Sequence, residues 1–179
     1  NLKLKKEIKM AIPAYMTIEG QNQGEISSGA LSEDSVGTAT QEGHEDEIMI
    51  QAFVHNVPRG TNEQSGQITS MPAMKPMKIT KFIDKASPLL HNALTSGEQL
   101  TVTINWYRIS ASGEEELYYV MELENSVLVD IETILPSVGD PAMSHLAHME
   151  VLHINPGAIT WTHEAAGTEG AYRFGASAA

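Results

Sequence analysis

The sequence contains no cysteine among its 179 residues, which excludes a disulfide scaffold, a thiol nucleophile and a thiolate metal site. Basic residues are also scarce, with 11 Lys and Arg against 23 Asp and Glu and a formal net charge of -12. A surface of that charge repels phosphate groups, so nucleic acid and anionic membrane surfaces are not expected partners. No stretch approaches the about 20 apolar residues of a membrane-spanning helix, so membrane insertion is not expected either.

The composition is that of a globular protein, with 41% hydrophobic and 19% charged residues. Residues 11–168 have the length of a single domain. Residues 1–10 hold four lysines, but polar residues follow too soon for a signal peptide, so we interpret them as a disordered leader or added sequence before a natural start at Met10. Residues 169–179 are rich in Gly, Ala and Ser and are predicted to form a flexible tail.

Alternation of apolar and polar residues with period two dominates the chain and predicts half-buried β-strands. It is strongest at 48–55, 100–107 and 117–124. Weaker strand candidates are 14–19, 25–31, 76–83, 126–134, 146–154 and 158–163. Because 116–125 runs directly into 126–135, we expect a bend or bulge near Asn125. The pattern predicts a mainly β fold, a compact two-sheet barrel or sandwich.

One segment, residues 87–96, is predicted to be a short α-helix flanking the sheets. Ser87 is a suitable N-cap, Pro88 suits the first turn and Gly97 suits the left-handed C-terminal position. A helix of about ten residues is not stable alone, so it must pack on the sheet. The polar segment 57–75 shows no periodicity and is predicted to be a long loop.

Three groups of polar residues are candidates for chemical sites. His44, Glu45, Asp46 and Glu47 fit a metal or acid–base site, but a solvated turn before the strand at 48–54 fits better, since neighbouring strand residues point to opposite faces. His145, His148 and His153 do not share one face of a strand. Asp130 and Glu132 lie on the polar face opposite Val127, Val129 and Ile131. The residues therefore predict no catalytic, cofactor-binding or metal site.

Several short motifs occur together in a characteristic order. They are AYMTIEG (14–20), GHEDE (43–47), ITKFIDKASPLL (79–90), SGE (96–98), WYR (106–108), VDI (129–131), ITWTHE (159–164) and AGT (166–168). In this order and spacing the chain resembles the haemolysin-coregulated protein (Hcp) family, the inner-tube protein of the bacterial type VI secretion system. The resemblance covers about residues 11–168. The chain departs from the family at 155–158 (NPGA), where a strand usually continues, and after Gly170.

The resemblance implies a non-enzymatic subunit whose homohexameric rings stack into a tube, with small effectors carried in the lumen. Its partners would be copies of itself and the spike and sheath proteins, and it would leave the cytoplasm without a signal peptide. By resemblance, Ala52 and Val54 are candidates for facing the channel. The extended loop 57–75 would reach a neighbouring copy, with the candidate contacts Pro58, Arg59, Asn62, Gln64 and Gln67.

Two other functions fit the residues. One is a monomeric ligand- or carbohydrate-binding β-sandwich that uses the loop 57–75. The other is a metal-dependent hydrolase that uses His44 and nearby carboxylates. Native mass separates the tube subunit from both, and elemental analysis for bound metal tests the hydrolase.

Overall fold

The computed structural model describes residues 12–140 and 147–174, so the predicted leader 1–10 lies outside the described residues. The strands are β1 (Ala14–Gly20), β2 (Gly24–Glu25), β3 (Ile48–Val54), β4 (Arg59–Thr61), β5 (Ile68–Pro72), β6 (Met77–Phe82), β7 (Leu100–Ile109), β8 (Glu115–Ile134), β9 (Met149–Asn155), β10 (Ala158–His163) and β11 (Thr168–Arg173). The helices are α1 (Glu33–Val36) and α2 (Ser87–Ser96), with 3-10 turns at Gly37–Ala39 and Glu164–Ala166. The predicted mainly β fold is confirmed.

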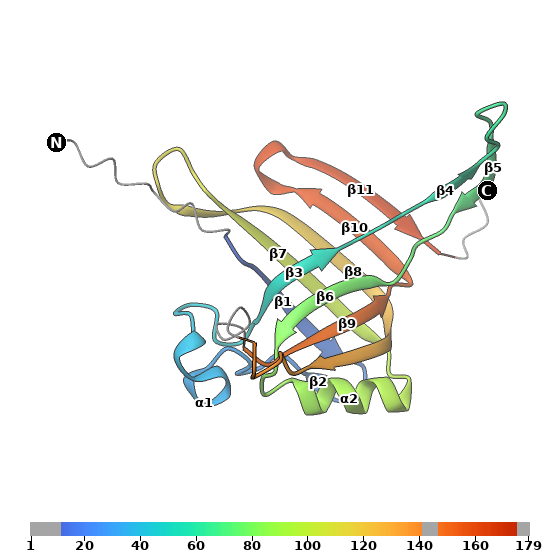
Figure 1. Ribbon diagram of the computed structural model, residues 1–179. Coiled ribbons are helices and arrows are strands. Elements are labelled where there is room, and N and C mark those ends of the chain that lie inside the picture. The colour runs from blue at the N-terminus through green and yellow to red at the C-terminus, as the bar shows by residue number, and fades with distance from the viewer. Residues whose placement is uncertain (1–11, 141–146, 175–179) are drawn as a thin grey trace.

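The main sheet closes on itself to form a barrel. Its strand order is β11-β10-β8-β7-β1-β3-β6-β9, and β9 also pairs with β8. All these pairings are antiparallel. Strands β10 and β11 extend beyond the closed barrel as a flap, and β4 and β5 form a separate two-stranded sheet that projects from the body (Figure 1). Closure removes most of the free sheet edges.

Strand β8 belongs to both halves of the barrel because it is bent near its middle. Its first half pairs with β7 and β10, and its second half pairs with β9. On β7, Leu100 pairs with Ser126 of β8 and Val102 pairs with Leu123. Two steps along β7 therefore correspond to three steps along β8, so β8 carries an extra residue there. Asn125 lies in this bulge at a φ of 48°. The bulge expected near Asn125 is therefore confirmed, and it allows one strand to change partners.

Apolar side chains of alternate strand positions fill the barrel. The largest cluster of buried side chains includes Met16, Ile18, Ile48, Ile50, Met77, Ile79, Leu100, Val102, Ile104, Leu123, Leu152 and Ile154. Helix α2 adds Leu90 and Ala93 from one face to this cluster. The helix lies across one end of the barrel (Figure 1), as the need to bury its apolar stripe requires.

The ends of α2 follow the sequence prediction at one terminus and differ at the other. Gly97 adopts the left-handed conformation, with φ 65° and ψ 31°, and its N–H bonds back to the helix. The N-cap residue is Ala86 rather than Ser87, and no side chain caps the helix there. Ser87 is instead the first helical residue and uses its hydroxyl inside the protein, in the buried network described below.

Two other local predictions are wrong. Beyond Glu25, which ends the short strand β2, residues 26–31 form bends and turns instead of the predicted strand 25–31, because Gly29 takes a φ of 69° and Ala30 bonds back to Ser27. The predicted flexible tail does not begin at 169, since Thr168–Arg173 forms β11 and pairs with β10 along its whole length. Composition failed here because the partner strand, rather than intrinsic propensity, orders this Gly- and Ala-containing segment.

Candidate assembly surfaces

A bulge in β3 decides which side chains this strand exposes. Strict alternation places Ile48, Ile50, Ala52 and Val54 on one face. The register against β6 shifts between Ile50 and Ala52, so the alternation reverses there. Beyond the shift Phe53 packs on the core, while Ala52 is exposed and Val54 is 58% exposed. Both candidates for facing a channel therefore lie on the outer surface of the barrel.

The outer surface around Val54 is chemically mixed. Four residues form a row across neighbouring strands. Val54 of β3 pairs with Lys78 of β6, and Lys78 pairs with His153 of β9. His153 also pairs with Asp130 of β8. Directly opposed side chains on one sheet face are about 5 Å apart at Cβ. This row therefore presents an apolar group, a cation, an imidazole and a carboxylate side by side.

The segment predicted to be a loop at 57–75 is a β-hairpin that extends far from the body (Figure 1). Asn62 closes its tip, where Oδ1 accepts N–H bonds from Gln64 (2.9 Å) and Ser65 (3.0 Å). Backbone bonds Ala73 N–H to Pro58 O (2.9 Å) and Lys75 N–H to Asn56 O (3.1 Å) continue the pairing toward the barrel. The prediction of an irregular loop is wrong because cross-strand bonds, rather than an apolar face, hold this segment.

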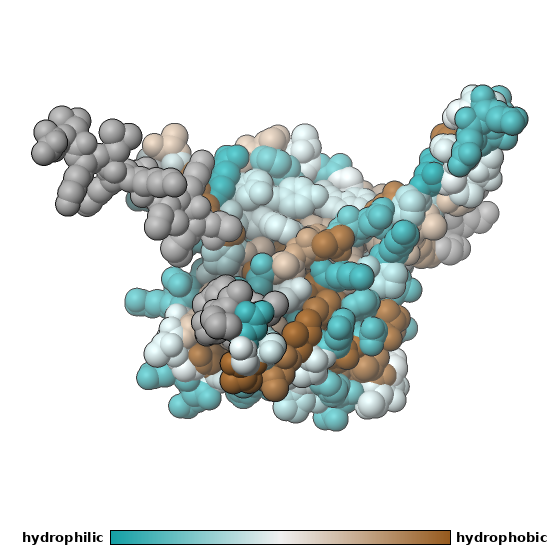
Figure 2. Space-filling model, in the orientation of Figure 1, coloured by the Kyte–Doolittle hydropathy of each residue, from teal (hydrophilic) through white to brown (hydrophobic). Residues whose placement is uncertain are grey.

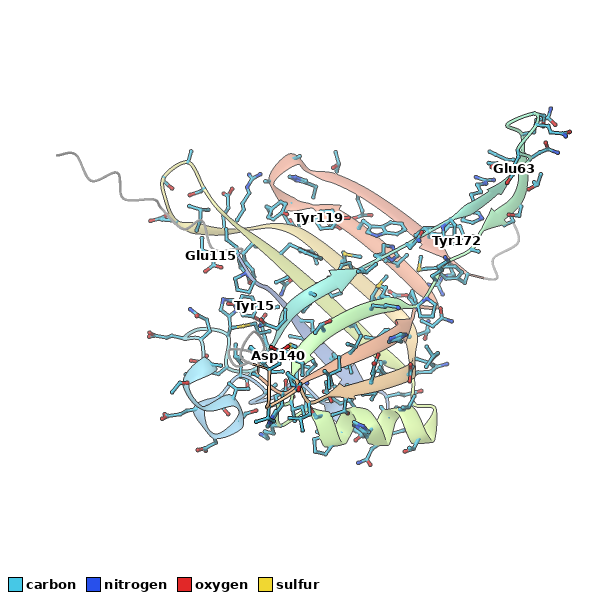
Figure 3. All side chains as sticks on the ribbon, in the orientation of Figure 1. Tyr15, Glu63, Glu115, Tyr119, Asp140 and Tyr172 are labelled. Atoms are coloured by element: carbon cyan, nitrogen blue, oxygen red, sulfur yellow. The ribbon has the colours of Figure 1, made fainter. Side chains whose placement is uncertain are left out.

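The five predicted contact residues are all placed on this hairpin. Arg59, Asn62, Gln64 and Gln67 are exposed, and Pro58 is half-buried. Arg59 Nε donates to the carbonyl of Ser70 across the hairpin (3.2 Å). The hairpin also exposes apolar groups, with Ile68 60% and Met71 56% accessible. Figure 2 shows it as a mainly hydrophilic arm, and Figure 3 marks Glu63 near its tip.

Among the described residues, the main sheet has unpartnered strand edges at β11 and at the end of β3. Strand β11 pairs with β10 alone, and β3 pairs with β1 only at residues 48–50, which leaves one edge of 51–54 open. The Phe174 N–H donates to Gly157 O (2.9 Å), on the β10 side. Since N–H groups alternate along a strand, those of Glu169, Ala171 and Arg173 point to the open edge. Such edges are templates for pairing with another chain.

His44 and Glu47 form part of an aromatic cluster rather than a solvated turn. The His44 ring stacks on Tyr15, with ring centroids 3.8 Å apart and 4° between the planes, and Tyr107 contacts it edge-on at 5.3 Å. His44 Nδ1 hydrogen-bonds to Glu47 Oε2, and Asn105 Nδ2 donates to Glu47 Oε1 (3.3 Å). The solvated-turn interpretation is therefore wrong for these two side chains, which attach the turn to β1 and β7.

Tyr15 shows the electrostatic effect of this cluster. Burial, with smaller contributions from the carboxylates of Glu115 and Glu47, raises the pKa of Tyr15 to about 12. Figure 3 shows Tyr15 below Glu115. The fold therefore favours the neutral phenol, whose ring packs against His44 and Tyr107.

Reasoning from the sequence missed a buried ion network that joins β6, β9 and α2. Lys81 is fully buried, and its Nζ contacts Glu150 Oε1 (2.6 Å) and Asp84 Oδ1 (2.9 Å). The Ser87 hydroxyl donates to the same Glu150 oxygen (2.7 Å). Burial raises the pKa of Asp84, against the opposing effect of Lys81. A signal was present, because Lys81 continues the buried alternation of Met77 and Ile79.

A third buried carboxylate, Glu98, holds the turn after β1. Its Oε1 accepts N–H bonds from Asn22 (2.6 Å) and Gln23 (2.8 Å), and Gln23 Nε2 donates to Oε2 (2.7 Å). The backbone bond from Gln23 is the main reason that the pKa of Glu98 lies below its ordinary value. These bonds bring together the β1–β2 turn and the residues after α2.

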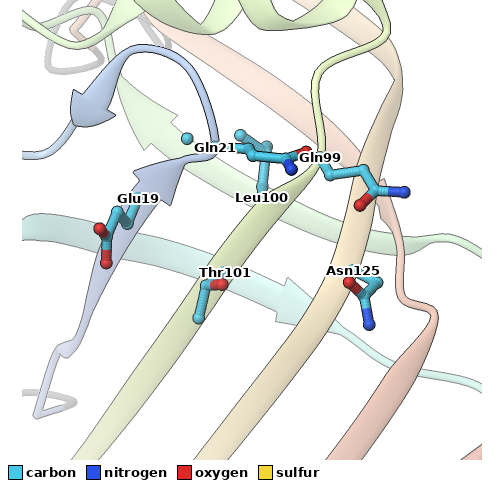
Figure 4. A pocket seen from close by; sticks show the side chains of 7 residues that line it. Glu19, Gln21, Gln99, Leu100, Thr101 and Asn125 are labelled. Carbon is cyan, nitrogen blue, oxygen red and sulfur yellow. The ribbon is translucent and has the colours of Figure 1, made fainter.

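Next to this turn lies an open recess of about 300 Å³ (Figure 4). Its lining is Glu19, Gly20, Gln21, Gln99, Leu100, Thr101 and Asn125. The polar groups of this lining are the Glu19 carboxylate, the Thr101 hydroxyl and the carboxamides of Gln21, Gln99 and Asn125. They form no nucleophile–base pair. The recess therefore offers hydrogen bonds to a polar surface rather than a set of catalytic groups.

The two described histidines of this group are not part of a metal-binding cluster of described residues. His145 lies outside the described residues, His148 is exposed, and His153 faces outward on β9. In residues 12–140 and 147–174, no group of three or more His, Asp or Glu side chains is placed to hold a metal ion. The same residues contain no helix of the length and apolarity that crossing a membrane requires.

Comparison with known proteins identifies a family for almost the whole barrel. Residues 15–163 match the family described as "Type VI secretion system effector, Hcp". The chain is 52% identical over 162 residues to the "Major exported protein" of Pseudomonas aeruginosa, covering 90% of this chain and 94% of that protein.

Solved structures agree with the sequence match. A crystal structure of an Hcp protein superimposes with a TM-score of 0.86 at 39% identity, over 92% of this chain and all of the other. The secreted protein Hcp3 of Pseudomonas aeruginosa gives a TM-score of 0.76 at 46% identity, over 91% and 98% of the two chains. The chain therefore belongs to the Hcp family of type VI secretion system proteins.

Proposed function

We propose that this chain is a structural subunit of the type VI secretion tube, which acts by shape and self-association rather than by catalysis. The observation that carries the proposal is a closed barrel with a protruding hairpin and, within the described residues, unpartnered strand edges at β11 and β3, in a member of the Hcp family. Six copies form a ring through different patches on each copy, and rings stack into a hollow tube.

The open edges supply the main contacts within a ring. Backbone groups at the edge of β11 of one copy pair with the open edge of β3 of the next copy. In such a heterologous contact, an incomplete ring still has one free β11 edge and one free β3 edge. Further copies therefore add until the ring closes. A stable contact buries about 800 Å² per partner, which edge pairing and the adjoining side chains supply together.

The lumen carries small effectors, and Ala52 and Val54 lie on its wall. Support comes from their exposure beyond the β3 bulge, which places two small apolar side chains beside Lys78 and Thr80 of β6. The spike and sheath proteins of the apparatus are the other partners. The relative named "Major exported protein" supports movement of this chain from the cytoplasm to the outside of the cell.

Export by the apparatus is tested in the bacterium that makes the chain. The protein should be found in the culture medium when the sheath is intact and should stay in the cells when the sheath gene is deleted, with a cytoplasmic enzyme as the control for lysis. Equal amounts in the medium of both strains would contradict the proposal.

A further inference from the structure

A cluster of aromatic rings connects the end of β3 to the flap formed by β10 and β11. Beyond the bulge of β3, Phe53 and His55 point to the inner face of the sheet. The Phe53 ring contacts Trp106 of β7 edge-on, with centroids 5.1 Å apart, and the His55 ring lies 6.0 Å from Trp161 of β10. Strands β3 and β10 are not hydrogen-bonded neighbours in the described sheet. Ring contacts rather than a backbone ladder therefore connect β3 to the flap.

The polar atoms of this cluster are enclosed without hydrogen-bond partners. Both ring nitrogens of His55 and Nε1 of Trp106 are buried and have no partner among the described residues. Buried polar atoms of this kind are rare in folded proteins, because each one costs the free energy of its lost hydration. A charged imidazole costs more than a neutral one in such a place, and burial accordingly lowers the pKa of His55 below its ordinary value of 6.5.

The charged groups around the cluster do not compensate a positive charge on His55. The titratable side chains on the inner face of the packed strands are Lys81 of β6, Glu150 of β9, Tyr119 of β8, His163 of β10 and Tyr172 of β11. Glu150 is already bonded to Lys81, with Oε1 2.6 Å from Nζ. The exposed cations Lys75 and Lys78 lie on the segment that pairs beside His55, and both would repel an imidazolium.

We infer that His55 is an acid-sensitive switch, whose protonation opens the contact between β3 and the flap. The charged ring has no acceptor inside the cluster, so it moves to solvent and its contact with Trp161 is lost. The stability that the neutral ring contributes is complete above pH 6.5 and is lost as the pH falls through the lower folded pKa. The flap carries β11, so acid should also weaken self-association, a consequence that rests on the proposed function.

Tryptophan fluorescence tests the switch directly, because the chain has two tryptophans and both belong to this cluster. The emission maximum of the native chain should move to longer wavelength between about pH 7.5 and about pH 5, since opening exposes the indole rings to water. His55→Phe and His55→Gln cannot take up the proton and should lose more than half of this shift. The control His91→Phe, at an exposed position of α2, should keep it. No shift in the native chain, or an equal shift in both His55 variants, would overturn the inference.

Amide hydrogen exchange is the second arm of the test, because it locates the opening. After correction for the intrinsic rates, exchange in β10 and β11 relative to β1 should be at least about ten-fold faster in acid than at neutral pH, and His55→Phe should abolish the difference. Equal acceleration in β1 and β10 contradicts a local switch. Native mass at the two pH values separates this inference from the proposed function. A chain that is monomeric at both contradicts the proposed function alone, since fluorescence and exchange still decide the switch.

Discussion

At the scale of single residues, the fold depends on a few buried charged groups that hold elements together. Lys81 holds two carboxylates from different elements, Glu150 on β9 and Asp84 before α2. Removing one partner of such a network leaves buried charge without compensation, which costs far more than the intact network contributes.

Replacing Lys81 with Met is therefore expected to lower the free energy of unfolding by about 3–5 kcal/mol, as measured by urea denaturation. The matched control is Lys85→Met, four residues away on an exposed position, which should change it by less than about 0.5 kcal/mol. Equal effects of the two substitutions would show that the buried network does not stabilise the helix contact.

Tyr15 gives a prediction for alkaline pH. Its folded pKa of about 12 lies above the ordinary value of 10, so the fold favours the neutral phenol. The corresponding stability is complete below pH 10 and is lost as the pH rises from 10 toward 12. Tyr15→Phe should therefore lose less stability than the native chain between about pH 9 and pH 11, in urea denaturation at both values. Burial also raises the pKa of Tyr107 and Tyr119, so part of the alkaline loss should remain.

At the scale of elements, the sequence predicts what is local and fails on what depends on a partner strand. Alternation correctly predicted the strands around Ile50, Ile104 and Met121, and the Pro88 and Gly97 signals predicted α2. The reversal at Ala52 was not predictable, because a bulge is defined against the neighbouring strand rather than within its own. For the same reason the sequence pattern predicts irregular segments at 57–75 and 169–179, where the structure has a hairpin and β11.

The candidate assembly residues are predicted by the family resemblance rather than by the apolar–polar pattern of the sequence. Nothing in the periodicity marks Arg59 or Gln64 as part of a projecting arm, and alternation alone assigns Val54 to the core side. The aromatic stacking of His44 on Tyr15 joins residues 29 positions apart, which only the three-dimensional pairing of β1 with β3 brings together.

If β3 lines the lumen, a substitution at its exposed residue Val54 should affect cargo binding without affecting ring formation. Val54→Lys should leave the native mass unchanged and reduce the amount of effector that co-purifies with the protein, because a charge on the channel wall disfavours an apolar contact. Ile109→Lys is the matched control, since Ile109 is 56% exposed on β7 and should leave cargo unaffected. A fall in native mass for Val54→Lys would place the Val54 side chain in a contact between copies rather than on the lumen wall.

The open edge of β11 predicts a defect in assembly without loss of the fold. The N–H of Ala171 points to the free edge, so Ala171→Pro removes a donor for the next copy and keeps the bonds to β10. We expect the circular dichroism spectrum of the native protein with a dissociation constant for assembly raised at least ten-fold. Ala111→Pro in the β7–β8 turn controls for a general effect of proline. Native assembly by Ala171→Pro would exclude β11 as the pairing edge.

At the scale of the whole molecule, the chain combines a rigid closed barrel with features that a solitary protein normally avoids. Its described residues include strand edges without a partner at β11 and at the end of β3, and a long arm with exposed Ile68 and Met71. Natural β-proteins usually cover or charge their edges to prevent association. These features become consistent when the exposed surfaces belong to contacts between copies.

Native mass measured by light scattering at two protein concentrations tests this central claim most directly. The account predicts a particle of about 116 kDa, six copies of the 19.4-kDa chain, that persists on ten-fold dilution from the micromolar range. A mass of one chain at both concentrations would contradict it.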